Sequence, residues 1–132
     1  MSSYLLDTNI VSFYLKGDES LKDKVADRID SIALSMISYY EVLSGLQSIN
    51  ANRRIREFED FCSLIEVVNI DKASILASCR IYASLKRSGN LIDDIDILIA
   101  GIAMSKNLVM VTDNTGHFER IPELNVENWK FR

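Results

Sequence analysis

Short apolar runs alternate with longer helical segments along almost the whole chain, and this alternation limits the fold more than any other feature. The runs that predict strands cover residues 2–6, 32–36, 64–70 and 108–111, with a further candidate at 126–129. The segments between them predict helices over residues 8–16, 20–30, 38–49, 52–63, 72–87 and 93–106. Strands that alternate with helices form βαβ units, in which helices cover both faces of a mostly parallel sheet. We therefore expect an α/β fold with a sheet of four to five strands.

Several residues suit the ends and the interior of these predicted helices. Ser38 is predicted to cap the helix after the second strand, with Glu41 three residues later in the capping-box arrangement. Asp71 is predicted to cap the longest helix. Gly101 lies inside the last predicted helix at a cost of about 1 kcal/mol relative to alanine, which indicates close packing of that helix on the sheet.

Length and composition limit the class of protein. A chain of 132 residues with 48% apolar residues is expected to form one domain over residues 1–132. No apolar run approaches the roughly 18 to 20 residues of a membrane span, and the N-terminus lacks the pattern of a secretory signal. Cys62 and Cys79 lack metal-ligand spacing and are interpreted as reduced core thiols of a cytoplasmic protein. The single histidine, His117, excludes mechanisms that need two imidazoles.

The net charge of −4 argues against broad electrostatic binding of nucleic acid. It does not exclude such binding, because carboxylates gathered around a metal ion would leave the outer surface more basic than the total suggests. Basic side chains gather in three local clusters, each of which also fits a solvated helix face. The clusters are Lys22, Lys24 and Arg28; Arg53, Arg54 and Arg56; and Lys86 with Arg87.

Acidic side chains follow the predicted strands or open the helices beside them. These acids are Asp7, Glu41, Asp96 and Asp113. Parallel sheets place their ligands beyond the carboxyl ends of the strands, so these side chains are expected to converge there. Converging carboxylates raise one another's pKa, and a divalent cation resolves the repulsion. Oxygen ligands without His or Cys fit Mg²⁺ or Mn²⁺, and such ions support phosphodiester hydrolysis.

Asp96 is the acid whose helical position is most informative. It lies beside the predicted apolar stripe of its helix, in line with Ala100 and Ala103, and points into a crevice without an evident ion-pair partner on that helix. The stripe consists of Ile95, Leu98, Ile99 and Ile102. Asp93 and Asp94 have a simpler interpretation, because carboxylates near a helix N-terminus satisfy free N–H groups. Thr112 and Asn114, beside Asp113, fit either ligand-orienting groups or turn residues.

Taken in order, five segments of the chain resemble those of a PIN-domain ribonuclease. They are Leu6–Asn9; Ser38–Leu46; Asp96–Ala100; Val111–Asn114 with Phe118; and Ile121–Pro122 with Val126–Trp129. Within PIN domains the chain is most similar to VapC toxins of prokaryotic toxin–antitoxin (VapBC) pairs. The match covers nearly the whole chain.

The resemblance implies a three-layer α/β/α fold and a Mg²⁺- or Mn²⁺-dependent endoribonuclease that inhibits translation or growth. It also implies a homodimer, an RNA substrate with tRNA among the candidates, and inhibition by a cognate VapB-like antitoxin. Asp7, Glu41 and Asp96 match the three main acids of the family, and Asp94 matches a secondary acid. The fourth position of the family falls on Asn114, or on Asp113 beside it. Asp93 stands where the family commonly has glycine.

On this basis we expect Asp7 and Asp96 to bind the metal, with Glu41 contributing directly or through water. Arg53, Lys86 and Arg87 are candidates for contacts with the RNA backbone.

Two other classes of function stay open. A phosphotransfer or phosphatase domain would use Asp7 as a nucleophile, but Asn9 replaces the second aspartate of the D-x-D-x-T pattern. A non-catalytic protein-binding module would use the acids only as helix caps.

Overall fold

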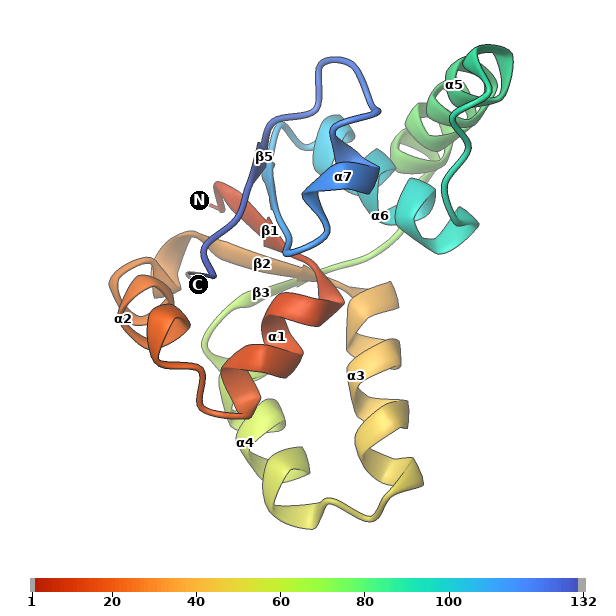
Figure 1. Ribbon diagram of the computed structural model, residues 1–132. Helices are drawn as coiled ribbons and strands as arrows, with labels where there is room; N and C mark the ends of the chain where they lie inside the picture. The colour runs from red at the N-terminus through yellow and green to blue at the C-terminus, as the bar shows by residue number, and fades with distance from the viewer. Residues whose placement is uncertain (1, 131–132) are drawn as a thin grey trace.

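The computed structural model describes residues 2–130, which form a five-stranded parallel sheet in the order β3-β2-β1-β4-β5 (Figure 1). The strands are β1 (Tyr4–Leu6), β2 (Ile32–Ser35), β3 (Glu66–Val68), β4 (Val109–Val111) and β5 (Val126–Glu127). The predicted α/β fold is confirmed, including the fifth strand. Each strand is shorter than the apolar run that predicted it: Leu64 and Ile70, at the ends of the third run, are exposed, and Met36 at the end of the second run begins α3.

Helices cover both faces of this sheet. They are α1 (Thr8–Leu15), α2 (Glu19–Asp27), the 3₁₀ helix η1 (Ile29–Ser31), α3 (Met36–Ser48), α4 (Asn52–Ser63), α5 (Lys72–Ser88), α6 (Asp94–Ser105) and α7 (Thr115–Phe118). In Figure 1, α1 to α4 lie below the sheet, and α5, α6 and α7 lie above it. Within residues 2–130, no helix combines the length and apolarity needed to cross a bilayer.

Two separate cores, one on each face of the sheet, hold the three layers together. Leu5 belongs to the core that includes Ile81 of α5 and Ile99 of α6. Leu6, the next residue, belongs to the core that includes Ile10 of α1 and Phe58 of α4. Successive side chains of a strand point to opposite faces, so β1 contributes to both cores and lies in the middle of the molecule. The predicted three-layer α/β/α arrangement is therefore confirmed.

The order of the strands reverses direction between β1 and β4. From β1 the chain adds β2 and β3 on one side, and β4 and β5 then lie on the other. The two strands pair in register, with Leu6 opposite Val111, and the amide of Asp7 donates to the carbonyl of Val111 over 2.8 Å. A crevice at the carboxyl ends of β1 and β4 is the usual ligand position in such sheets.

The predicted cap at Ser38 is wrong. Ser35 is the N-cap of α3, and its hydroxyl accepts the backbone N–H of Ser38 over 3.0 Å. The helix therefore begins two residues earlier, and Glu41 does not close a capping box. The prediction for Asp71 is confirmed, because its carboxylate accepts the N–H of Ser74 in a complete capping box.

The surroundings of α6 differ from the sequence prediction in two respects. The close approach at Gly101 is to α5: a Cβ there would overlap Ser78 Oγ and lie 2.6 Å from the Ser74 carbonyl oxygen. The predicted apolar stripe is only partly correct, since Ile95 is 41% exposed. The helix is covered by both the sheet and α5, so its buried face is wider than a single stripe. The buried residues are Ile97, Ile99, Ala100, Gly101, Ile102 and Ala103.

Both cysteines are free thiols, as expected. The predicted place in the core is wrong for Cys79, which is exposed on α5, whereas Cys62 is half-buried and packs against the core that contains Phe58.

Candidate active site

Asp7 lies at the carboxyl end of β1 and is also the N-cap of α1. Its Oδ1 accepts the N–H of Thr8 over 2.8 Å, and its Oδ2 accepts the hydroxyl of Thr112 over 2.8 Å. The side chain is only 6% exposed, yet no lysine or arginine among residues 2–130 forms an ion pair with it. The role of Asp7 as a helix cap accounts for the hydrogen bond at Oδ1. It does not account for the burial of an ionisable side chain without a basic partner.

The electrostatic environment of Asp7 shows which other acids lie near it. The pKa of Asp7 is raised from 3.8 to about 6. Burial raises it most, hydrogen bonds from Thr112 and Thr8 lower it, and the charges of Asp96 and Glu41 raise it. Asp7 after β1, Glu41 on α3 and Asp96 on α6 therefore lie near enough for their charges to interact. Such repulsion favours either a shared proton or a bound cation.

Glu41 is held toward Asp7 by a residue that sequence reasoning did not single out. The hydroxyl of Thr8 donates to Glu41 Oε1 over 2.6 Å and lies 3.0 Å from Ser38 Oγ. This bond replaces the predicted capping box and joins the first turn of α1 to α3. The position of Thr8, directly after an acid at the end of a strand, is the sequence feature that could have identified it as a site residue.

Asp96 is in the first turn of α6 and is partly buried, with a side chain 20% exposed. Its Oδ2 lies 3.3 Å from Nδ1 of His117, and the same ring nitrogen lies 2.8 Å from Nδ2 of Asn114. The acid thus has no partner on its own helix, as predicted, but it contacts the imidazole carried by α7. Sequence reasoning set His117 aside because one imidazole cannot act alone.

The three polar residues after β4 have different surroundings. Thr112 is buried between Asp7 and the backbone N–H of Asn114, which donates to its hydroxyl over 2.9 Å. Asn114 reaches the Asp96 side of the crevice through His117. The carboxylate of Asp113 instead accepts from the amide of Asn128 over 3.0 Å. Of Asp113 and Asn114, the asparagine is therefore the one in contact with the acid site.

The remaining predicted site residues lie apart from the three acids. Asp94 is exposed and lines a cavity of about 360 Å³ between α5 and α6. Lys86 and Arg87 are exposed in the last turn of α5. Arg53, in the first turn of α4, forms an ion pair of 3.0 Å with Glu57.

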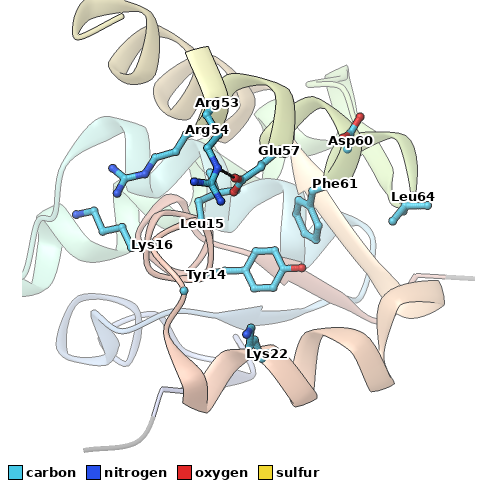
Figure 2. A pocket seen from close by; sticks show the side chains of 11 residues that line it. Tyr14, Leu15, Lys16, Lys22, Arg53, Arg54, Glu57, Asp60, Phe61 and Leu64 are labelled. Atoms are coloured by element: carbon cyan, nitrogen blue, oxygen red, sulfur yellow. Dashed lines mark hydrogen bonds and ion pairs between the residues drawn. The ribbon is translucent and has the colours of Figure 1, made fainter. Parts of the chain in front are cut away.

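Arg53 lines a second hollow, of about 690 Å³, on the side of the molecule formed by α1, α2 and α4 (Figure 2). Arg54, Lys16 and Lys22 also line it, and Tyr14 and Phe61 form its apolar wall. None of Asp7, Glu41 and Asp96 lines this hollow, so it is separate from the acids near the carboxyl ends of β1 and β4.

The chemistry of the acid site fits a hard divalent cation. Its donors are carboxylate oxygens, and the buried one at Asp7 lacks a basic partner among the described residues. Within residues 2–130, no group of three or more His, Cys, Asp or Glu side chains lies close enough together to hold a metal ion. Mg²⁺ is commonly held by one or two carboxylates plus waters, so an open arrangement suits it.

Comparison with known proteins agrees with this arrangement. The family model described as PIN domain matches residues 4–124. The tRNA(fMet)-specific endonuclease VapC of Salmonella typhimurium is 33% identical over 131 residues, which cover 98% of this chain and 99% of the relative. Ribonuclease VapC1 of Methanocaldococcus jannaschii is 32% identical over 126 residues, covering 96% and 86%. A crystal structure of DNA-bound VapBC from Salmonella typhimurium matches with a TM-score of 0.91 at 33% identity, covering 98% of this chain and 99% of that one.

Proposed function

The chain belongs to the PIN-domain family, as a ribonuclease of the VapC group of toxin–antitoxin toxins, and from this premise we propose that it is a Mg²⁺- or Mn²⁺-dependent endoribonuclease. Its cleavage of RNA inhibits translation or growth. The observation that supports the metal most directly is the meeting of Asp7, Glu41 and Asp96 without a lysine or arginine paired to any of them among residues 2–130.

Asp7 and Asp96 are the proposed ligands, with Glu41 contributing directly or through water. All three offer only oxygen, which suits Mg²⁺ and Mn²⁺. When bound, such an ion supplies positive charge against the attacking and leaving oxygens of a phosphodiester.

The neighbouring threonines hold these carboxylates in place. The Thr112 hydroxyl and the Thr8 N–H fix both oxygens of Asp7, and the Thr8 hydroxyl fixes Glu41. These donors belong to the ends of β4 and α1 rather than to a long loop. Asp7 and Glu41 are therefore oriented before substrate arrives, which removes a reorganisation cost from the reaction.

The proposed substrate is RNA, and we propose tRNA as the class to test first because the Salmonella relative is named a tRNA(fMet)-specific endonuclease. Arg53, Lys86 and Arg87 are proposed to contact the backbone, where cations bind phosphates without reading sequence. All three side chains are exposed.

Cleavage of purified tRNA tests this proposal. End-labelled initiator tRNA and elongator tRNA are incubated with the protein in Mg²⁺, Mn²⁺ or EDTA, and the fragments are mapped. We expect cleavage only with metal, and its loss in Asp7→Asn and Asp96→Asn. Glu59→Gln, an exposed acid on α4, is the control that keeps activity. Equal cleavage by the parent and the two site variants would contradict the proposal, and a phosphoenzyme formed at Asp7 would favour the phosphotransfer alternative.

We further propose that a cognate VapB-like antitoxin inhibits the enzyme, which matches the VapBC composition of the Salmonella structure. Both partners then act in the cytoplasm, where RNA is available. Co-expression with the neighbouring open reading frame, followed by co-purification and a cleavage assay, tests this. An active, uninhibited protein in the presence of every neighbouring product would contradict it.

A homodimer is proposed through the outer face of α5 and α6. This face carries exposed apolar side chains, namely Ile75, Leu76, Tyr82 and Ile95, around the cavity of about 360 Å³. Light scattering should give twice the chain mass of 15.0 kDa, and Leu76→Asp should reduce it to one chain mass. A parent protein that stays monomeric at high micromolar concentration would contradict this part of the proposal.

A further inference from the structure

The hollow of about 690 Å³ between α1, α2 and α4 is positively charged, although the whole chain carries a net charge of −4 (Figure 2). We call it the basic hollow. Its basic lining residues are Lys16, Lys22, Arg53 and Arg54. Two acids, Glu57 and Asp60, also line it, so four positive charges against two negative ones leave a net charge of +2.

Most of the positive charge of the basic hollow is available to a ligand. Only Arg53 is paired, through its ion pair of 3.0 Å with Glu57. Lys16, Lys22 and Arg54 are exposed and form no ion pair with any residue in the described part of the chain. Figure 2 shows the side chains of Lys16 and Arg54 extending toward the same edge of the hollow. A concave surface lined by unpaired cations concentrates anions.

The wall of the basic hollow adds an aromatic surface to this charge. The rings of Tyr14 and Phe61 lie in contact, with centroids 5.1 Å apart, and Tyr14 is only half-buried. Cations beside an aromatic ring are the combination that holds single-stranded nucleic acid, because the cations pair with phosphates and the ring stacks on a base. A protein segment would need several acidic side chains to pair with the same cations, whereas every nucleotide of RNA supplies one negative charge.

Helix α1 connects the basic hollow to the acid site. Thr8, in its first turn, follows Asp7 and hydrogen-bonds Glu41, while Lys16 is its C-cap. A helix of this length spans about 12 Å. An RNA chain with one phosphate at the acid site can therefore extend along α1 and place further nucleotides in the hollow.

We propose that the basic hollow is a second contact site for the RNA substrate, remote from the bond that is cleaved. Lys16, Lys22 and Arg54 bind phosphates there, and Tyr14 stacks on a base of a single-stranded segment. The inference rests on the RNA substrate proposed above and extends it beyond Arg53, the one residue of the hollow named there. Because the site does not touch the reacting atoms, it lowers KM and leaves kcat unchanged.

Binding of fluorescently labelled initiator tRNA, measured by anisotropy in EDTA, tests this. The double variant Lys16→Gln with Arg54→Gln removes two cations of the hollow. Its matched control, Lys72→Gln with Arg56→Gln, removes the same charge from exposed positions on α5 and α4 that do not line the hollow. We expect the dissociation constant to rise about tenfold in the first variant and less than about threefold in the control.

Three further measurements separate the contacts. The slope of log K against log salt concentration should become shallower by about two in the hollow variant, one for each lost phosphate contact. Tyr14→Leu should weaken binding about fivefold without changing this slope, because stacking releases no counter-ions. With Mg²⁺, the hollow variant should show a KM about tenfold higher at unchanged kcat. Far-UV circular dichroism and thermal unfolding check that each variant folds.

The possible results distinguish this site from the function proposed above. Equal losses of tRNA binding in the two double variants would overturn the contact site, since general charge would then govern binding. Unchanged tRNA binding in the hollow variant, together with loss of the co-purifying neighbouring product, would assign the hollow to a protein segment and also overturn it. Binding that depends on the hollow without metal-dependent cleavage would contradict the proposed function alone. A parent that binds no tRNA would contradict both.

Discussion

Thr112, at the end of β4, donates its hydroxyl to Asp7 Oδ2 at the end of β1 over 2.8 Å, although 105 positions separate the two residues. The bond crosses the point where the strand order reverses, and it joins the proposed metal ligand to the segment that also carries Asn114 and His117. The donor lowers the pKa of Asp7 against the larger effect of burial, so it stabilises the ionised form that a cation requires.

Removing this donor should raise the pKa of Asp7 further. Thr112→Val keeps the shape of the side chain but leaves a buried carboxylate oxygen without its hydrogen bond. At pH 8, where Asp7 is ionised, we expect the free energy of unfolding to fall by about 1.5–3 kcal/mol. Carbon-detected NMR titration of the Asp7 carboxyl and urea denaturation measure the two effects. Thr112→Ser, which retains a hydroxyl, is the control, and an unchanged pKa in the valine variant would contradict the interpretation.

The contribution of Asp7 to the stability of the metal-free protein should fall as pH rises from 3.8 to about 6. The folded protein binds the Asp7 proton more tightly than the unfolded chain does, so the contribution of this group is fully present below the lower value and is lost through the upper one. The full change corresponds to about 3 kcal/mol. Because other carboxyl groups titrate in this window, the measurement is the difference in urea midpoint between the parent and Asp7→Asn across the range. A difference that does not vary with pH would refute it.

Asp7→Asn should therefore be more stable than the parent at neutral pH without metal, by up to about 3 kcal/mol, because it removes a buried charge and keeps the cap oxygen. Differential scanning calorimetry in EDTA checks this. The same variant should lose RNA cleavage, so stability and activity move in opposite directions. A variant less stable than the parent would show that the carboxylate is stabilising in the free protein.

A divalent ion should stabilise the parent and not Asp7→Asn. Binding to the folded state alone adds about 2.7 kcal/mol at a free ion concentration one hundred times the dissociation constant. Thermal unfolding at pH 7.5 with increasing Mn²⁺ or Mg²⁺ gives this shift, and excess EDTA should reverse it. Equal shifts in the parent and in Asp7→Asn would mean that the ions bind elsewhere.

Adding one methyl group at Gly101 should destabilise the fold, whereas adding it at Gly45 should not. A Cβ at Gly101 meets α5 backbone and Ser78, and overpacking of this kind costs about 1–3 kcal/mol. A Cβ at Gly45 on α3 meets nothing within 4 Å, so alanine there should stabilise the protein by up to about 1 kcal/mol. Urea denaturation of the two alanine variants measures the change in the free energy of unfolding. Changes of the same sign in both variants would contradict the predicted difference in packing.

The alternation of apolar and helical segments was sufficient to predict the parallel sheet and to place acids at the carboxyl ends of β1 and β4. That prediction succeeded because the direction of parallel strands fixes which ends meet. The cap of α3 was wrong because Ser35 and Ser38 both precede helical residues, and the choice depends on where β2 stops pairing. The sequence alone does not show at which residue β2 stops pairing.

The side-chain contacts between distant segments at the acid site could not be predicted from the sequence pattern. The bonds from Thr8 to Glu41 and from Thr112 to Asp7 join side chains 33 and 105 positions apart, and no local propensity encodes them. The neighbour of Gly101 was misassigned for the same reason, since helical spacing marks a tight face without identifying what packs on it.

The central position of β1 has a consequence for synthesis. Its residues leave the ribosome before those of β4, with which they pair on one side, so the middle of the sheet is completed only after Val111 has been synthesised. Until then Asp7 lacks both Thr112 and Asp96, and a nascent chain or one truncated before β4 does not assemble the acid site. A cell that makes this enzyme is exposed to it only after the chain has been synthesised through Thr112 and β4 has paired with β1.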